Sequence, residues 1–386
     1  MATTDMLAGI RILDLTTVML GPYCTETLAN MGADVIKLEP ELGDEIRRVG
    51  KPAMNRRMGP VHLTMNRGKR SVVWDLKTAE GRRDVMDLIT SSDVLIHNLR
   101  QDAVERAGLD YESVRKVRPD IVYVHCTGFG SDGPYAGRPA YDDIIQAVSG
   151  ATSLIPRVTG DETPRFLPLA IADKVSGLHA VYAVLGALLY RERSGAGQAV
   201  EVPMLESFTH FLLQEHMYAH TFVPPNGPAG YPRQLDPDRQ PMATSDGHIV
   251  VAPYTDTRWL RLFDVVGHRE ALAVPELETP ILRLKNVAIM QRALAAIVAG
   301  RPSDHWLGLF TEHDIPCCRV NGLEQVFEDP HLVATGFFER LTHPTEGDYI
   351  GLKPPVRFGA GRPIAVPHAP LIGEHTDSVR DSLRRP

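Results

Sequence analysis

The chain contains few cysteines and no block of basic residues. Its four cysteines, Cys24, Cys126, Cys317 and Cys318, have no metal-binding spacing. The adjacent pair does not readily form a disulfide, so this cysteine usage is typical of a reducing compartment, and we expect a cytoplasmic protein. The formal net charge is -7. Without a basic cluster, the sequence argues against nucleic acid as a partner.

Long hydrophobic runs and several catalytic signatures are also missing. The longest apolar run, residues 181–190, is too short to cross a bilayer and ends in charged residues, so no membrane partner is expected. The first ten residues lack the features of a signal peptide. There is no G-x-S-x-G motif and no Walker loop. His216 and His220 lie four residues apart on a predicted helix, but no H-E-x-x-H motif is present, so we predict no metal site.

What the chain does contain is enough apolar sequence for more than one core. Of its 386 residues, 43% are hydrophobic, which suits two or three compact units. Predicted strands alternate with helices through the first half, a pattern that favours a doubly wound α/β domain with its ligand site at the carboxyl ends of the strands. We predict a large Rossmann-like domain over residues 1–224, a smaller α/β domain over 225–325 and a segment, 326–386, that returns to the first. The predicted strands of the large domain are residues 10–15, 34–39, 71–76, 93–97, 121–126 and 199–202.

The turn after the first strand distinguishes this chain from dinucleotide-binding proteins. Residues 16–22 read Thr-Thr-Val-Met-Leu-Gly-Pro, without the G-x-G-x-x-G that would hold a pyrophosphate. Glu39 ends the second strand, as an acidic residue does in nucleotide-binding folds. An NAD-dependent oxidoreductase therefore remains an alternative, but a weakened one. Basic and amide side chains near strand ends, namely Asn66, Lys69, Asn98 and Arg100, fit a phosphate-bearing ligand lying across the edge of the sheet.

The most informative stretch is residues 167–180. An apolar run stops at Asp173, and an amphipathic helical pattern follows. The simplest interpretation of Asp173 is a helix N-cap, because its carboxylate accepts orphan backbone N–H groups. The alternative is a carboxylate at the mouth of a cleft, which attacks an activated carbonyl. Small residues such as Gly177 and Gly186 leave room for close packing against this helix.

Taken together, these segments resemble CoA-transferase family III, the family of formyl-CoA:oxalate and carnitine CoA-transferases and of α-methylacyl-CoA racemase. The resemblance covers nearly the whole chain. Its motifs are Leu13 to Thr16 with Gly21-Pro22, residues 32–39, 66–71 and 93–100, Ala172-Asp173 with Gly177, residues 195–198, and the tail at 373–376.

This resemblance implies a Rossmann-like large domain, a small domain and two chains interlocked as a homodimer. It implies that Asp173 is the catalytic nucleophile. It also implies coenzyme A as a co-substrate, with no tightly bound cofactor. The CoA contacts of similar proteins fall here on Val18, Met19, Leu20, Lys69, Asn98, Arg100 and Arg106. Many relatives have arginine where this chain has Pro40 and glutamine where it has Met19.

The implied reaction is CoA transfer from an acyl-CoA thioester to a free carboxylic acid, through an aspartyl anhydride and an aspartyl-CoA thioester. The nearest alternative is an α-methylacyl-CoA racemase, which needs a histidine and an aspartate as its acid/base pair. The histidine would fall at Tyr141, and tyrosine, with a pKa near ~10, is a poor base at neutral pH. A non-catalytic CoA-binding protein is a further alternative.

Overall fold

The computed structural model describes residues 4–55 and 57–384 and divides the chain into two compact units. The first unit comprises Met1–Thr152, Phe166–Gln214 and Val333–Pro386, and the second comprises Ser153–Arg165 and Glu215–Leu332. The predicted boundaries are after residues 224 and 325, and these breaks of the chain lie after Gln214 and Leu332. The assignment of the short segment Ser153–Arg165 to the second unit was not predicted.

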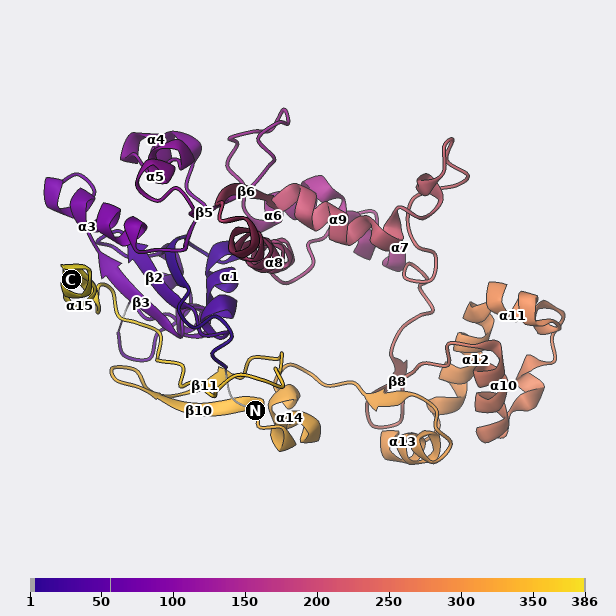
Figure 1. Cartoon of the computed structure of the whole chain (residues 1–386). Helices are drawn as coiled ribbons and strands as arrows, with labels where there is room; N and C mark the ends of the chain where they lie inside the picture. The colour runs from indigo at the N-terminus through magenta and orange to yellow at the C-terminus, as the bar shows by residue number, and fades with distance from the viewer. Residues whose placement is uncertain (1–3, 56, 385–386) are drawn as a thin grey trace. The chain divides into compact units, whose positions relative to one another are not determined.

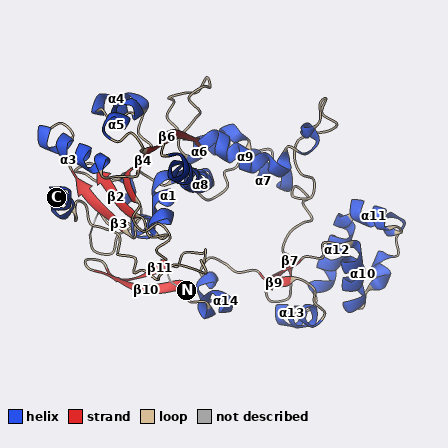
Figure 2. Cartoon of the chain, viewed as in Figure 1, coloured by secondary structure: helices blue, strands red, loops and turns tan. Residues whose placement is uncertain are grey.

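The first unit is built on a six-stranded parallel sheet in the order β3-β2-β1-β4-β5-β6 (Figures 1 and 2). Order 3-2-1-4-5-6 has its topological switch point between β1 and β4, where ligands bind in doubly wound sheets. The predicted mixed α/β class is confirmed. The strands are β1 (Arg11–Leu15), β2 (Asp34–Glu39), β3 (Lys69–Val73), β4 (Val94–His97), β5 (Val122–Thr127) and β6 (Gln198–Pro203).

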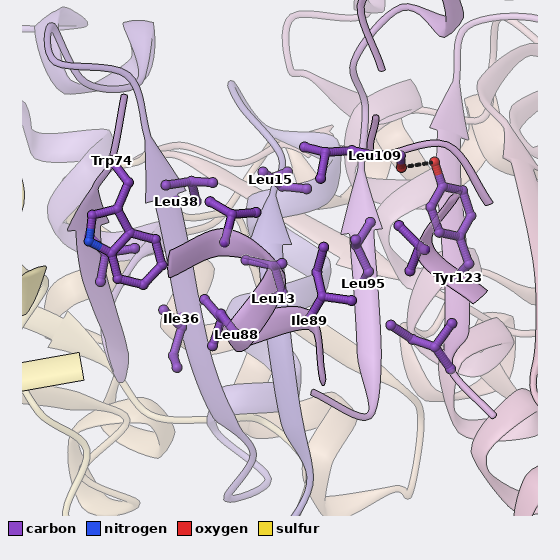
Figure 3. Close-up of a cluster of buried hydrophobic side chains, with 14 of the residues drawn as sticks. Leu13, Leu15, Ile36, Leu38, Trp74, Leu88, Ile89, Leu95, Leu109 and Tyr123 are labelled. Atoms are coloured by element: carbon purple, nitrogen blue, oxygen red, sulfur yellow. Dashed lines mark hydrogen bonds between the residues drawn. The ribbon is translucent and has the colours of Figure 1, made fainter. Parts of the chain in front are cut away.

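Helices cover both faces of this sheet. On one face, Leu13, Ile36 and Leu95 pack into a buried apolar cluster with Leu88 and Ile89 of α3 (Figure 3). On the other face, α1 packs against α8, which in turn contacts β5 and β6. The helices of this unit are α1 (Leu20–Ala29), α2 (Pro60–Met65), α3 (Ala79–Thr90), α4 (Gln101–Ala107), α5 (Tyr111–Val117), α6 (Asp142–Ser149), α8 (Ile171–Ser194), α9 (Met204–His216) and α15 (Thr376–Arg384).

The last segment of the chain packs within the first unit. It contains the antiparallel hairpin β10 (Phe338–His343) and β11 (Gly347–Leu352), followed by α15. Arg47 donates a hydrogen bond to the carbonyl of Pro370 at 3.0 Å, and Ser71 Oγ accepts one from the N–H of Gly373 at 2.9 Å. These contacts tie residues more than 300 positions apart in the sequence.

The second unit has its own apolar core around Trp259, Phe263, Leu294 and Phe310. A small antiparallel sheet runs in the order β7-β8-β9. Its elements are α7 (Leu154–Thr159), β7 (Met242–Ala243), β8 (His248–Val251), α10 (Asp256–Val265), α11 (Pro280–Lys285), α12 (Val287–Val298), α13 (Ser303–Glu312) and β9 (Cys317–Arg319), and α14 (Pro330–Ala334) spans the boundary to the first unit.

Helix α8 was predicted to begin at Asp173, but it begins at Ile171.

Among helices in the described ranges, α8 alone is long and apolar enough to cross a membrane by length and composition. This is weak evidence, because core helices of soluble proteins pass the same test. Ala180 and Val184 of α8 are fully buried, which is typical of such a core helix.

Candidate active site

The first turn, residues 16–19, joins β1 to α1 at the switch point and is held by side chains from separate elements. Asp14 of β1 accepts hydrogen bonds from the backbone N–H and the hydroxyl of Thr16, at 2.8 and 2.5 Å. Lys37 of β2 donates to the carbonyl oxygen of Thr16 at 2.6 Å. Asn98, just beyond β4, accepts from the N–H of Thr17 and donates to its carbonyl, at 3.0 and 2.9 Å.

Val18 has a conformation that β-branched residues rarely adopt. Its φ is +67°, and its N–H donates to Oδ1 of Asp44 at 3.0 Å. A β-branched residue at positive φ is strained, and such strain persists only where surrounding contacts over-determine the backbone. The contacts from Asp14, Lys37, Asn98 and Asp44 supply that constraint. The turn is therefore a rigid, preformed edge.

Buried ion pairs lie beneath the turn. Lys37 pairs with Asp44 at 3.0 Å, and Lys69 pairs with Asp14 at 3.3 Å, all four side chains being fully buried. Burial alone would raise the pKa of Asp14, but Lys69, Lys37 and two threonine hydroxyls outweigh it and lower that pKa. Removing one partner of such a pair leaves an uncompensated buried charge, which is costly.

Lys69 was predicted to contact CoA, and the structure gives it an inward position. It is the first residue of β3 rather than a residue before the strand, and only 1% of its surface is exposed. Its ammonium contacts Asp14, the carbonyl of Pro22 and Oδ1 of Asn66 within 3.3 Å, which accounts for all three donors. Burial lowers the pKa of Lys69 to about 8. In this structure Lys69 supports the start of α1 from below and presents no free cation to a ligand.

The carboxylate of Glu39 is likewise engaged by neighbouring side chains. Arg47 donates to both of its oxygens, at 2.7 and 2.5 Å, and Ser71 donates at 2.7 Å. Burial alone would raise the pKa of Glu39, but Arg47, Lys37 and Ser71 outweigh it and lower the pKa to about 2. Glu39 is therefore not free to bind a ribose, which removes one of the two features that suggested an NAD-dependent enzyme.

The other predicted CoA-binding residues divide into two groups. Met19 precedes α1 and Leu20 begins it, so both lie at the switch point beside Val18 and Asn98. Arg100 precedes α4, and its side chain is exposed. Arg106 lies in the last turn of α4 and pairs with Asp102 at 2.7 Å on the surface. The two arginines belong to the segment that follows β4, at the same edge of the sheet as the first turn.

Helix α8 approaches this turn closely at Gly177. A Cβ atom at this position would lie 2.8 Å from the carbonyl oxygen of Leu20 and 3.1 Å from the ring of Tyr23. The predicted close approach to α8 is thus confirmed, and the partner is α1. Since residues i and i+4 lie one above the other on a helix, Asp173 is one turn from this contact.

Asp173 lies in the first turn of α8, and its position corrects the N-cap prediction. The N-cap is Ala170, and no side chain caps the helix from that position. The backbone N–H of Asp173 donates instead to Oδ1 of Asp142 in α6, at 3.0 Å. Within the described residues, nothing donates a hydrogen bond to the Asp173 carboxylate. The structure therefore leaves this carboxylate available for a ligand.

The surroundings of Asp173 favour its protonated form. Burial raises the pKa of Asp173 to about 7, the negative charges of Asp142 and Asp143 add to the rise, and Lys174 opposes it. Gln146 holds Asp142 in place with a 2.6 Å hydrogen bond and also binds the backbone of Leu167. A half-buried carboxylate with a strongly raised pKa is typical of a functional site.

Asp142 and Asp44 were not predicted as site residues. Each accepts a hydrogen bond from a residue far away in the sequence: Asp142 from Asp173, 31 residues away, and Asp44 from Val18, 26 residues away. An acidic residue at the start of a helix normally indicates capping of its own helix, so no local pattern could reveal these roles. In the part of the chain that the structure describes, no group of three or more His, Cys, Asp or Glu side chains is arranged to hold a metal ion.

Comparison with known proteins identifies the family. The sequence model of CoA-transferase family III matches residues 7–376, and the chain belongs to this family. It is 32% identical to succinate–glutarate CoA-transferase of Agrobacterium fabrum, over 98% of this chain and 95% of that one. It is 33% identical to formyl-CoA:oxalate CoA-transferase of Streptomyces avermitilis, over 97% and 95%. The chain is therefore an enzyme that transfers CoA between an acyl-CoA and a carboxylate.

Solved structures agree with this assignment. The fold matches that of a CaiB/BaiF family protein from Brucella suis with a TM-score of 0.83 and 29% identity, covering 98% of this chain and all of that one. It also matches Rv3272 of Mycobacterium tuberculosis, with a TM-score of 0.83 and 25% identity, over 98% of this chain and 100% of that one.

Proposed function

We propose that Asp173 is the nucleophile and that transfer proceeds through two covalent intermediates on its carboxylate. A carboxylate oxygen attacks the thioester carbonyl of the donor, the C–S bond breaks, and a mixed anhydride and CoA thiolate form. The thiolate attacks the Asp173 carbonyl of the anhydride, which releases the donor acid and leaves an aspartyl-CoA thioester. An acceptor carboxylate then reverses these steps. The supporting observation is that Asp173 combines a raised pKa with a carboxylate free of hydrogen bonds from the described residues.

We further propose that the Rossmann-like sheet binds CoA at its switch point, along the first turn and the segment after β4. The backbone N–H groups of Met19, Leu20 and Gly21 donate to no other described residue, and the start of a helix attracts negative charge. Val18, Asn98, Arg100 and Arg106 would complete this CoA site. Lys69 and the ion pairs beneath the turn would hold it in shape.

The enzyme is expected to work as an interlocked homodimer. On α8, Leu178, Tyr182 and Leu189 are about half exposed and recur at helical spacing, and Phe211 of α9 is exposed as well. Large exposed apolar faces mark interaction sites, and a second copy of the chain fits this face. Sedimentation of the purified protein as a monomer at micromolar concentration would contradict the proposal.

We also propose a cytoplasmic location, consistent with four free cysteines.

Racemisation of an α-methylacyl-CoA is the second candidate. The position that would need a histidine is Tyr141, the N-cap residue of α6, whose side chain is 63% exposed. An exposed tyrosine is a poor base at neutral pH, which favours CoA transfer. Deuterium incorporation at the α-carbon of a 2-methylacyl-CoA, measured in heavy water, would reverse this preference.

Trapping of the covalent intermediate tests the proposed function. The enzyme is incubated with a panel of acyl-CoA donors and treated with hydroxylamine, which converts an aspartyl thioester into a hydroxamate. Peptide mass spectrometry should then find the hydroxamate on Asp173, and Asp173→Ala should lose transfer while still binding CoA. Asp132→Ala, an exposed carboxylate of the same unit, serves as the control. Transfer without an adduct, or retained by Asp173→Ala, would refute the mechanism.

A further inference from the structure

Lys174 directly follows Asp173 in the first turn of α8. Its side chain is partly buried, and its ammonium forms no ion pair or hydrogen bond with a described residue. By contrast, Arg191 near the other end of α8 pairs with Asp93 at 2.9 Å. A charge that is partly withdrawn from water without a partner has lost hydration and gained no compensating contact. Lys174 is therefore a cation available to a ligand, one residue from Asp173.

The other charges that act on Asp173 are negative. Asp142 and Asp143 raise the pKa of its carboxyl group, whereas the positive charge of the neighbouring Lys174 opposes them. Both oxygens of Asp142 already accept hydrogen bonds from uncharged groups, the N–H of Asp173 at 3.0 Å and the amide of Gln146 at 2.6 Å. Neither contact neutralises Asp142, so an anion that approaches the carboxyl group of Asp173 is repelled unless a cation compensates.

The proposed reaction requires an anion at this point. In the aspartyl-CoA thioester Asp173 has lost its negative charge, whereas the charge of Lys174 remains. The acceptor acid attacks as a carboxylate: its oxygen bonds to the Asp173 carbonyl carbon, the C–S bond breaks, and CoA leaves as a thiolate. The attacking carboxylate must reach that carbon against the charges of Asp142 and Asp143. An ammonium beside the carbon offsets this repulsion and donates charge-assisted hydrogen bonds.

We propose that the ammonium of Lys174 binds the carboxylate of the acid substrate and holds it against the carbonyl carbon of the Asp173 thioester. This assignment rests on the proposed transfer through Asp173. By reversal of the same step, the ammonium also holds the donor acid as it leaves. Because the contact joins two charged groups, an uncharged nucleophile does not benefit from it. Lys174 thus favours acids over water as the group that attacks the thioester.

Discharge of the isolated aspartyl-CoA thioester tests this inference, because either a charged or an uncharged nucleophile can be supplied. The complete enzyme is incubated with acetyl-CoA, succinyl-CoA or benzoyl-CoA and is freed of donor and released acid by rapid gel filtration. The thioester on Asp173 is then treated in mildly alkaline buffer with the acid of the same donor, or with hydroxylamine, which is uncharged there. By microscopic reversibility, that acid must discharge the thioester. Peptide mass spectrometry follows the loss of the thioester with time.

Lys174→Met keeps the length of the apolar chain and removes the charge. We expect discharge by the acid to slow about tenfold or more, the usual effect of losing a charge-assisted contact, and discharge by hydroxylamine to change less than about twofold. Lys174→Arg keeps the charge and should retain most of the rate with the acid. Lys116→Met, which removes an exposed lysine of α5, is the matched control and should behave as the wild type with both nucleophiles.

Equal slowing of both nucleophiles in Lys174→Met would overturn the inference, because Lys174 would then act on the thioester or its departing thiolate rather than on the acid. Unchanged discharge by the acid would also overturn it, as would failure of this variant to form the thioester before any acid is added. None of these results contradicts the proposed function, provided that the wild type forms the thioester on Asp173. Active transfer by the wild type without that thioester refutes the proposed function instead.

Discussion

The backbone N–H of Asp173 donates a hydrogen bond to Oδ1 of Asp142, with 3.0 Å between nitrogen and oxygen. Asp142 thus takes the role that an N-cap side chain would have in α8, although it belongs to another helix. The contact also holds a second negative charge beside the Asp173 carboxylate. The same residue therefore positions Asp173 and, together with burial, keeps the pKa of Asp173 near 7.

This raised pKa predicts a pH-dependent rate. Only the ionised carboxylate attacks a thioester, so kcat/KM for the donor acyl-CoA should rise with pH and reach half its plateau near pH 7. A carboxylate with an ordinary pKa of about 4 would give a flat profile above pH ~5. Initial rates at low donor concentration, measured between pH ~5 and ~9, check this expectation. A flat profile over that range would show that Asp173 is ionised throughout.

Asp142→Asn should shift that profile toward lower pH. Asparagine keeps an oxygen that accepts the Asp173 N–H but removes a negative charge, so the Asp173 anion is less disfavoured. We expect the midpoint to fall by about one pH unit, with the plateau rate changed less than the midpoint. Asp132→Asn, which removes an exposed carboxylate of the same unit, should leave the midpoint unchanged. An unshifted midpoint in Asp142→Asn would show that the charge of Asp142 does not contribute to the raised pKa of Asp173.

Much of the first unit follows from local patterns. The buried runs at 10–15 and 34–39 correspond to β1 and β2, because alternation of short apolar strands and helices strongly constrains a parallel sheet. The same reasoning located the first turn, Asn98 and Asp173. The hairpin of β10 and β11 was not predicted, since half of its strand residues are exposed and the two strands lack a clear apolar alternation.

The environment of individual charges could not be predicted in this way. Lys69 looked like a cation available to a phosphate, yet Asp14 neutralises it inside the protein. Asp173 looked like a cap, yet its N–H is satisfied by Asp142. In both cases the deciding partner lies 31 to 55 residues away in the sequence. These groups come together only in the folded chain, so residue spacing and composition cannot predict the contacts between them.

Gly177 offers a test of the contact between α8 and α1. In Gly177→Ala the new Cβ would lie 2.8 Å from the carbonyl oxygen of Leu20, so α1 and the first turn must shift. We expect a loss of about 1–3 kcal/mol in the free energy of unfolding, typical of overpacking, together with a lower kcat/KM. Gly308→Ala, at an exposed position of α13, meets no described atom within 4 Å. It should stabilise the protein by about 0.5–1 kcal/mol, because alanine favours a helix, and equal effects of the two variants would refute the close contact.

Lys69→Met distinguishes a buried support from a ligand contact. The substitution removes one partner of a fully buried ion pair and leaves the Asp14 carboxylate without its closest cation. We expect the free energy of unfolding to fall by about 3–5 kcal/mol, as is usual for a broken buried pair. Denaturant unfolding measures this loss, and Lys77→Met, which changes a lysine outside the ion-pair network, should have little effect. Weaker CoA binding with unchanged stability would instead favour direct contact between Lys69 and CoA.

Asn98→Ala should affect CoA binding more than stability. The side chain makes two hydrogen bonds with the backbone of Thr17, at 3.0 and 2.9 Å, and both are lost in alanine. Since net contributions of such bonds are about 0.5–1.5 kcal/mol each, the protein should still fold. The first turn would then have to be ordered when CoA binds, so we expect KM for acyl-CoA to rise about tenfold with a smaller change in kcat. Gln101→Ala removes an exposed amide at the start of α4 that bonds only to Glu105 among the described residues. It should leave KM unchanged, because it does not touch the turn. If Asn98→Ala lowered kcat and left KM intact, Asn98 would be acting in the chemical step rather than through the shape of the CoA site.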